Sequence, residues 1–427
     1  MYIKINFKEE TVVKNQVKFF IIVSAILTGL IATGYAAGVI SREGSIGKES
    51  VSQAAEENVQ LYSEANIKNT VTGNVSSKNL VDPSNLLTSE DMEQTADLSG
   101  ATEIRITDNK KVNITKAGVY VIRGSGKEST VTVNGNKDDN IRLILGGVNI
   151  SNKNMPAIQV NSGKKIFITT TGNSQNKLEV TGAFTKTEES EVEAVIFSKS
   201  DLVLNGTGKL TVTSATGNGI SSEDKLKVTG GTYIINSEKH SLEGYNSVII
   251  SGGNFTVNTS KDAVHSENSA DNSSGFVYIS GGTFNINAAD DGIQATTFAV
   301  IDGGSFKVNA AEGIEATHVQ INDGDIDIQA SDDGINAAGK STSYGINLEV
   351  NGGKINVVMA DGDTDAFDSN GNLAINGGSI NIKANSAFDF DGTGQMNGGT
   401  VIVNGSQLSE LTNQMMGGFP GGRGRRR

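Results

Sequence analysis

The chain of 427 residues has no cysteine and no tryptophan, only three prolines, and aromatic residues at 5%. Without cysteine it forms no disulfide bond and no thiolate metal site, and it offers no cysteine nucleophile. The scarcity of aromatic residues argues against an ordinary sandwich or α/β enzyme. Glycine is abundant instead, with 52 residues, which suits short strands joined by tight turns.

The chain also has fewer basic than acidic residues. It contains 35 lysines and arginines and 48 aspartates and glutamates, which gives a formal net charge of -13. A chain of this charge repels the phosphates of nucleic acids, so we expect no nucleic-acid partner. The charge favours cations or neutral ligands. An acidic ligand would need a bridging metal ion.

The N-terminal region predicts a membrane segment. Residues 1–18 form a basic flank with four lysines, and residues 19–40 contain no charged side chain. At ~1.5 Å per residue this run crosses ~30 Å of hydrocarbon. We expect a single-pass transmembrane anchor in the bacterial cell membrane, with the flank in the cytoplasm and the main domain extracellular. Gly34 and Ala36 allow the alternative, a cleaved signal segment and a secreted protein.

Three further regions follow from composition. Residues 41–100 are rich in polar residues without a sustained period, which predicts a largely disordered spacer. Residues 411–427 form a Gly/Arg-rich tail. Between them, residues 101–410 contain an internal repeat that decides the fold.

The repeat is a pair of glycines, a variable residue and an apolar residue, and Asp323-Gly324-Asp325-Ile326 is a degenerate copy. Successive second glycines are 22, 29, 22, 20, 29, 25 and 21 residues apart; these glycines are Gly231, Gly253, Gly282, Gly304, Gly324, Gly353, Gly378 and Gly399. Such a period predicts a solenoid, and the alternation on both sides of the glycines predicts three short strands per coil. Stacked coils would place one apolar residue of each repeat in an interior column, namely Tyr233, Phe255, Phe284, Phe306, Ile326, Ile355, Ile380 and Val401.

A second column of acidic residues follows each glycine pair by about ten residues. If neighbouring coils bring the acids within ~5 Å, each pair repels by roughly 3 kcal/mol at an effective dielectric of ~20. Hard oxygen ligands without matching His or Cys favour Ca²⁺. The predicted metal ligands are Asp262, Asp290, Asp291, Glu312, Asp332, Asp333, Asp361, Asp363 and Asp365. The alternative is that these acids cap turns and face water.

No catalytic residue is assigned. The side chains that could act as the base of a polysaccharide lyase are Lys239 and Lys261, and the alternative is that both are solvated charges on turns. The three histidines, His240, His265 and His318, show no spacing for a triad or a metal site and are expected on the surface or in turns. Candidate sugar contacts are Tyr245, Tyr278 and Tyr344.

Several strings resemble a bacterial family of surface carbohydrate-binding domains. They include Leu87-Thr88-Ser89-Glu90-Asp91-Met92, Ile141-Arg142-Leu143-Ile144-Leu145-Gly146-Gly147-Val148-Asn149-Ile150 and Gly275-Phe276-Val277-Tyr278-Ile279-Ser280-Gly281-Gly282-Thr283-Phe284. The resemblance implies a pectate-lyase-like right-handed single-stranded parallel β-helix, calcium held by Asp carboxylates, and a lyase fold without lyase activity. With the N-terminal segment, it predicts an all-β solenoid preceded by one transmembrane helix.

The expected function is non-catalytic, calcium-assisted binding of a polysaccharide, acidic and pectin-like or cellulosic, at the bacterial cell surface. Two alternatives remain open: a calcium-dependent polysaccharide lyase, and a structural surface protein or adhesin. The sequence assigns no oligomeric state.

Overall fold

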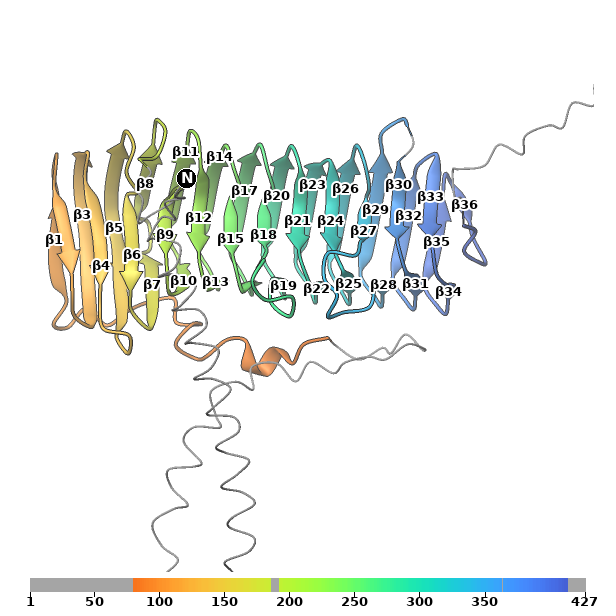
Figure 1. Ribbon diagram of the computed structural model, residues 1–427, viewed down its shortest axis with the longest axis horizontal. Coiled ribbons are helices and arrows are strands. Elements are labelled where there is room, and N and C mark those ends of the chain that lie inside the picture. Colours follow the sequence, from red (N-terminus) through yellow and green to blue (C-terminus); the bar gives the residue numbers. More distant parts are fainter. Residues whose placement is uncertain (1–79, 186–191, 363, 414–427) are drawn as a thin grey trace, which may run out of the picture. The chain divides into compact units, whose positions relative to one another are not determined.

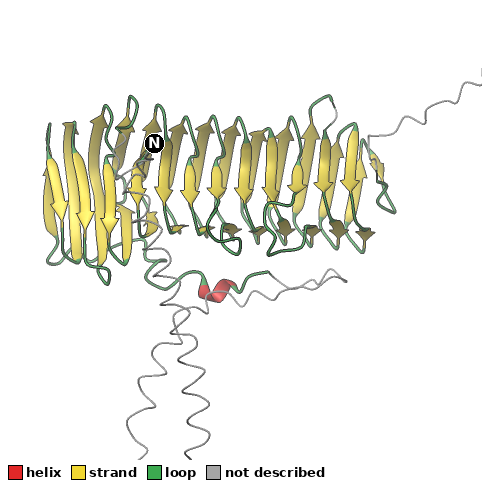
Figure 2. Ribbon diagram, viewed as in Figure 1, coloured by secondary structure: helices red, strands yellow, loops and turns green. Residues whose placement is uncertain are grey.

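A computed structural model describes residues 80–185, 192–362 and 364–413 of the protein. The chain divides into two units, Met1–Glu64 and Ala65–Arg427, and every described residue belongs to the second. In that unit, coils of strands stack side by side from β1 to the pair β35 and β36 (Figure 1). Strands and loops account for nearly all of it (Figure 2).

The strands form three ladders of parallel neighbours, two of which belong to one 24-stranded sheet. The first ladder contains β1 (Thr102–Ile106), β3 (Gly118–Lys127), β5 (Asn140–Asn152), β7 (Lys165–Thr170), β10 (Asp201–Gly206), β13 (Lys225–Val228), β16 (Ser247–Ile250), β19 (Phe276–Ile279), β22 (Phe298–Ile301), β25 (His318–Ile321), β28 (Asn347–Val350), β31 (Asn372–Ile375) and β34 (Gly394–Met396). The second contains β8 (Gln175–Val180), β11 (Lys209–Ser214), β14 (Thr232–Ser237), β17 (Asn254–Thr259), β20 (Thr283–Ala288), β23 (Ser305–Ala310), β26 (Asp325–Ala330), β29 (Lys354–Met359), β32 (Ser379–Lys383) and β35 (Thr400–Val403), and ends in the antiparallel β36 (Ser406–Gln407).

The third ladder is a separate twelve-stranded sheet. It contains β2 (Lys111–Ile114), β4 (Thr130–Asn134), β6 (Ile158–Ser162), β9 (Ala194–Ser198), β12 (Asn218–Ser222), β15 (Leu242–Gly244), β18 (Val264–Ser266), β21 (Asp291–Ala295), β24 (Glu312–Ala316), β27 (Ile335–Ala337), β30 (Asp365–Ser369) and β33 (Ser386–Phe390). From β7 onward a typical coil has three strands, one in each ladder, as the repeat predicts.

The glycine pairs make the corner between the first and second ladders. Gly253 and Gly304 have φ angles of 115° and 109°, a region that residues with a side chain rarely adopt. The backbone conformation therefore requires the second glycine of each pair. The number of residues between successive second glycines equals the length of each coil.

The interior contains the predicted column of apolar side chains. β14, β17, β20 and β23 align Tyr233, Phe255, Phe284 and Phe306 in register. Their rings stack at centroid distances of 5.3, 4.7 and 4.6 Å. Ile326 continues the column on β26. Each strand alternates buried and exposed residues here, so one face of this ladder fills the core and the other meets solvent.

Residues 80–100, the described part of the predicted spacer, include the 3-10 helix η1 (Pro83–Asn85) and contact the first ladder. Asp91 is fully buried. Its carboxylate lies 2.8 Å from the ammonium of Lys165 and 3.3 Å from that of Lys227, on β7 and β13. Gln94 adds a hydrogen bond of 3.2 Å to the carbonyl of Thr229. Polar contacts thus hold this segment across three coils.

The prediction of a transmembrane helix has to be corrected. Among the described residues, none lies in a helix long and apolar enough to cross a membrane. Residues 19–40, on which the prediction rested, lie outside the described part of the chain. An uncharged run of sufficient length is not by itself evidence of a spanning helix, so the single-pass membrane location and the membrane contact are withdrawn.

Candidate functional site

The twelve-stranded sheet places two columns of polar side chains on its outward face. The first column contains five of the predicted acids, with a histidine at one end and a serine at the other. Backbone hydrogen bonds or strand register place its members in successive coils; they are His240, Asp262, Asp291, Glu312, Asp333, Asp365 and Ser386. The second column lies three residues further along each strand and comprises Glu243, His265, Gln294, Glu315, Asn336, Asp368 and Asp389. Carboxylates of different coils therefore become neighbours in space.

The residues between the two columns explain this local geometry. Ile293 and Ile314 point into the core and are fully buried. Gly313 precedes Ile314, and a Cβ atom built there would lie 2.3 Å from the carbonyl oxygen of Gly334 in the next coil. Only a glycine is tolerated at such a contact. A Cβ atom at Gly292 would likewise lie 2.5 Å from the carbonyl oxygen of Gly313, so these glycines allow the close approach of coils that brings Asp291 and Glu312 together.

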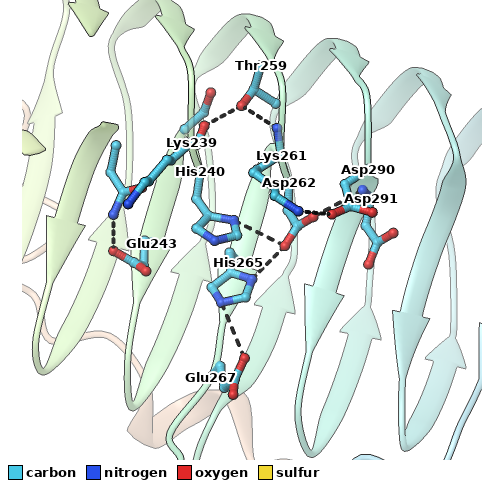
Figure 3. A network of polar contacts seen from close by, with 12 residues as sticks. Lys239, His240, Glu243, Thr259, Lys261, Asp262, His265, Glu267, Asp290 and Asp291 are labelled. Atoms are coloured by element: carbon cyan, nitrogen blue, oxygen red, sulfur yellow. Dashed lines mark hydrogen bonds and ion pairs between the residues drawn. The ribbon is translucent and has the colours of Figure 1, made fainter. Parts of the chain in front are cut away.

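Two groups of carboxylates are close enough to share a cation. One contains Asp262, Asp290 and Asp291, and the other contains Asp291, Glu312 and Glu315, each with ligand oxygens within 4.8 Å of one another. Two nearby lysines pair with acids of these groups: Lys261 lies 2.9 Å from Asp290, and Lys340 forms an ion pair with Glu315. Figure 3 shows the contact of Lys261 with Asp290 beside Asp291.

The crowding of acids shifts their proton affinities upward. Burial, followed by the charges of Asp262, Glu312 and Glu315, raises the pKa of Asp291 to about 9. Burial and the charge of Glu315 raise the pKa of Glu312 to about 7. Asp368, at the other end of the columns, is raised to a pKa of about 7 by burial and by the charge of Asp333. Negative charge in this part of the sheet exceeds what its own lysines offset.

Without divalent cations, the folded protein is expected to lose stability as the pH rises. Asp291, Glu312 and Asp368 have folded-state pKa values above their ordinary ones, so the folded state binds more protons than the unfolded state. This stabilisation is complete below the unfolded pKa values, about 4, and is lost as the pH rises through about 7 to 9. In chelator, thermal melts should show Tm lower by about 4 °C or more at pH 8 than at pH 5.5. A Tm that rises over this range would contradict the electrostatic account.

Asp262 behaves oppositely because it faces two histidines. Burial alone would raise its pKa, but the contacts with His240 and His265 outweigh burial and hold the pKa well below its usual range. The Nδ1 atoms of His240 and His265 lie 3.1 and 2.6 Å from Oδ2 of Asp262. Both rings point toward this carboxylate in Figure 3.

The remaining predicted metal ligands are placed less favourably. Asp332 and Asp361 are exposed, and neither belongs to a metal-sized cluster in the part of the chain that the structure describes. Asp333 is half-buried and accepts a hydrogen bond of 3.1 Å from the backbone N–H of Asp365. The side chain of Asp365 accepts a hydrogen bond from Ser386. Asp363 lies outside the described residues.

The two lysines considered as bases are both paired with acids. Lys239 forms an ion pair with Glu193. Hydrogen bonding to Asp290, with the charge of that residue, raises the pKa of Lys261. A general base at neutral pH would need a lowered pKa, so this arrangement opposes the role.

The three tyrosines differ in accessibility. Tyr278 is only 4% exposed and donates a hydrogen bond of 2.7 Å to Asp302. Tyr344 is half-buried and meets Phe298 edge to face at 5.5 Å. Tyr245, on the turn after β15, is 43% exposed. Of the three, Tyr245 is the one whose ring offers a substantial surface to a ligand.

The contact between the two histidines was not predicted from the sequence. The sequence predicted His240 and His265 as isolated surface or turn residues, yet His265 is buried and the two rings stack at 3.8 Å. The signal was present in the coil length, because His240 and Asp262 are 22 residues apart, as are Gly231 and Gly253. Residues one coil apart are stacked neighbours.

Comparison with known proteins supplies the family. The model of a family described as carbohydrate-binding domain-containing protein matches residues 108–364, more than half of the chain. The chain belongs to this family. The resemblance read from the sequence is therefore confirmed, and a carbohydrate is the partner class that the family indicates.

Two similar proteins extend the comparison. A carbohydrate-binding domain-containing protein of Acetivibrio thermocellus is 32% identical over 130 residues, which make up 30% of this chain and 45% of the relative. The chain thus spans less than half the length of that relative. A solved structure of the polysaccharide lyase-like protein from C. thermocellum, a gadolinium derivative, has 22% identity, covers 72% of this chain and 94% of its own, and gives a TM-score of 0.34.

Proposed function

We propose that this member of the family binds an acidic, pectin-like polysaccharide through Ca²⁺ held on the outward face of the twelve-stranded sheet, without cleaving the polymer. The observation that carries the proposal is the cluster of Asp291, Glu312 and Glu315, whose oxygens lie within 4.8 Å of one another. The raised pKa values of Asp291 and Glu312 support it, because they express repulsion that a bound cation would remove.

The donor atoms of this cluster suit calcium. All are carboxylate oxygens, which Ca²⁺ prefers, and Ca²⁺ accepts 6 to 8 of them in flexible geometry. Asp290 is a neighbouring donor through its contact with Asp291 and Asp262. Asp262 is a poorer donor, because its Oδ1 accepts a hydrogen bond of 3.1 Å from the N–H of Asp291 and its Oδ2 faces the histidines. Ligands beyond the protein's own would come from water or from the polymer.

Calcium would also supply the attraction that the protein lacks. With a net charge of -13, the chain repels a polymer of uronates unless a cation lies between the two. A neutral glucan would instead call for exposed aromatic faces. Tyr278 is buried, which leaves Tyr245 as the exposed ring among the tyrosine candidates. These features favour an acidic polymer over a cellulosic one.

The positions of the lysines favour binding without cleavage. A lyase needs a base that accepts the proton next to the uronate carboxylate. Lys239 and Lys261 are both engaged by acids, and the pKa of Lys261 is raised. We therefore place the lyase second, as the alternative that a simple assay distinguishes.

The proposal predicts calcium-dependent retention of the full-length protein on immobilised polygalacturonate. Replacing Glu312 and Glu315 together with glutamine should weaken the binding by about tenfold or more, because both changes remove ligands from one site. Asp325→Asn is the control: Asp325 is an exposed acid outside the cluster that pairs with Lys354 on the second ladder. Its affinity should remain within about twofold of the unchanged protein.

Two results would overturn the proposal. Undiminished retention in chelator would exclude the role of calcium, and retention on cellulose but not on polygalacturonate would assign the neutral polymer. Release of unsaturated products, followed by their ultraviolet absorbance in calcium, would establish the lyase instead. Binding without such absorbance is the expected outcome.

A further inference from the structure

The histidine pair forms a compact group with Asp262 across two neighbouring coils. His240 precedes β15, Asp262 precedes β18, and His265 lies within β18. The imidazole rings stack at 3.8 Å with an interplanar angle of 20°. One ring nitrogen of each histidine and one carboxylate oxygen of Asp262 all lie within 4.8 Å of one another. Stacked coils thus supply three ligand atoms from a stretch of 26 residues, 240–265.

One atom of this group has an unmet bonding requirement. Nδ1 of His240 is buried and lies 3.1 Å from Oδ2 of Asp262 as an ion pair, but the two atoms are not aligned for a hydrogen bond. Buried polar atoms normally have a well-aligned hydrogen-bond partner, because losing the bond to water without replacing it is unfavourable. A cation that coordinates both this nitrogen and the carboxylate of Asp262 would satisfy it.

We infer that His240, Asp262 and His265 form a site for a divalent transition-metal ion, best matched by Zn²⁺ and separate from the carboxylates assigned to calcium. Two imidazole nitrogens and one carboxylate oxygen are donors typical of Zn²⁺, whereas calcium prefers oxygen alone. Ligand atoms around a tetrahedral Zn²⁺ at about 2.0–2.1 Å lie about 3.3 Å apart. The observed separations of 3.1 and 2.6 Å between Oδ2 of Asp262 and the two Nδ1 atoms are shorter than this and would widen toward it when an ion binds.

The surroundings support the same assignment. The N–H of Asp291 holds Oδ1 of Asp262 at 3.1 Å and leaves Oδ2 directed at the histidines. On the far side of the His265 ring, Nε2 lies 3.8 Å from Glu267, an arrangement close to the outer carboxylate that often orients a metal-bound histidine. Asp262 and His265 are 4% and 8% exposed. Three protein ligands leave one coordination position of a tetrahedral ion for an exchangeable ligand.

The test is a titration of the full-length protein with Zn²⁺ alone, after treatment with chelator and dialysis. Isothermal calorimetry should show one Zn²⁺ per chain at this site. The double variant His240→Gln with His265→Gln should bind at least about 100-fold more weakly, because it removes both nitrogen ligands. His318→Gln is the matched control: it changes the chain's third histidine, which also pairs with an acid, Glu349 at 3.2 Å. Its affinity should be unchanged.

If the double variant fails to fold, a spectroscopic measurement on the unchanged protein and on a single variant still tests the site. Co²⁺ bound to the protein should give visible absorption bands of a nitrogen-ligated ion, and the single variant His240→Gln, which keeps the contact between His265 and Asp262, should weaken and shift them. Absence of Zn²⁺ binding, or equal binding by the double variant, would overturn the inference. The Zn²⁺ site uses other residues than the cluster proposed for calcium, so the two proposals can fail separately. The variant with Glu312→Gln and Glu315→Gln should impair calcium-dependent retention and leave Zn²⁺ binding intact.

Discussion

Replacing Asp91 with alanine is expected to lower the free energy of unfolding by about 3–5 kcal/mol, the usual cost of removing one partner from a buried ion pair. Asp91 is fully buried and neutralises two ammonium groups, at 2.8 Å on Lys165 and 3.3 Å on Lys227. Both lysines are nearly buried too, so the variant would leave positive charge without a partner. Chemical denaturation of the full-length protein measures the change as a lower midpoint.

The matched control for Asp91 is another acid of the same segment. Asp97 is exposed and its hydrogen bonds go to Ser99, two residues away. Asp97→Ala should therefore change the stability by no more than about 0.5 kcal/mol. If Asp91→Ala has an equally small effect, the ion pairs of Asp91 with Lys165 and Lys227 make no net contribution to stability.

The pH dependence of this contribution has a definite sign. Burial disfavours the charged form of Asp91, but the hydrogen bond from Lys165 and the charges of both lysines outweigh burial and lower its pKa. A lowered pKa means stability that is present at neutral pH and lost as the pH falls below about 4, through the folded-state value. The difference between the unchanged protein and Asp91→Ala should shrink only in acid.

The sequence predicted the coil because the evidence for it is local. The glycine pair recurs at each corner where the backbone needs a positive φ, as at Gly253. The apolar residue two positions later then enters the core, as Phe255 and Phe284 do in register. A period imposed by backbone geometry survives in the sequence, so the solenoid, its three strands and its interior column could all be read from spacing.

Contacts between distant residues could not be read in this way. Asp91 pairs with residues 74 and 136 positions away, and nothing near Asp91 has a period that would reveal them. The outward columns are an intermediate case. Asp291 and Glu312 follow the glycine pairs and were predicted as neighbours, but Glu315 and His265 lie three residues later, where the side chains vary from coil to coil.

The outer faces of the two sheets differ in what covers them. On the 24-stranded sheet, an apolar cluster with Val81 covers Ile249, Tyr278 and Phe298, so this part of the outer face is already occupied by the chain's own N-terminal segment. On the twelve-stranded sheet, the outward columns crowd carboxyl groups together, and their mutual repulsion together with burial raises the pKa of Asp291. The proposed cation and polysaccharide site therefore lies on the twelve-stranded sheet, where these carboxyl groups gather.

Phe284→Ala should have an effect about as large as the loss of Asp91, again about 3–5 kcal/mol. The Phe284 ring is almost completely buried and stacks on Phe255 at 4.7 Å and on Phe306 at 4.6 Å. Its removal leaves a cavity between two aromatic neighbours and breaks both stacking contacts, each worth about 0.5–1.5 kcal/mol beyond burial. Chemical denaturation would again report the loss as a lower midpoint.

Two further variants separate packing from other effects of this change. Phe284→Leu fills part of the cavity and should cost clearly less than Phe284→Ala, whereas Asn285→Ala, at the next and exposed position of β20, should be nearly neutral. Because each coil of a solenoid contacts mainly its neighbours, the damage should be local. Hydrogen exchange should therefore accelerate most in β17, β20 and β23, and uniform acceleration along the chain would contradict this nearest-neighbour account.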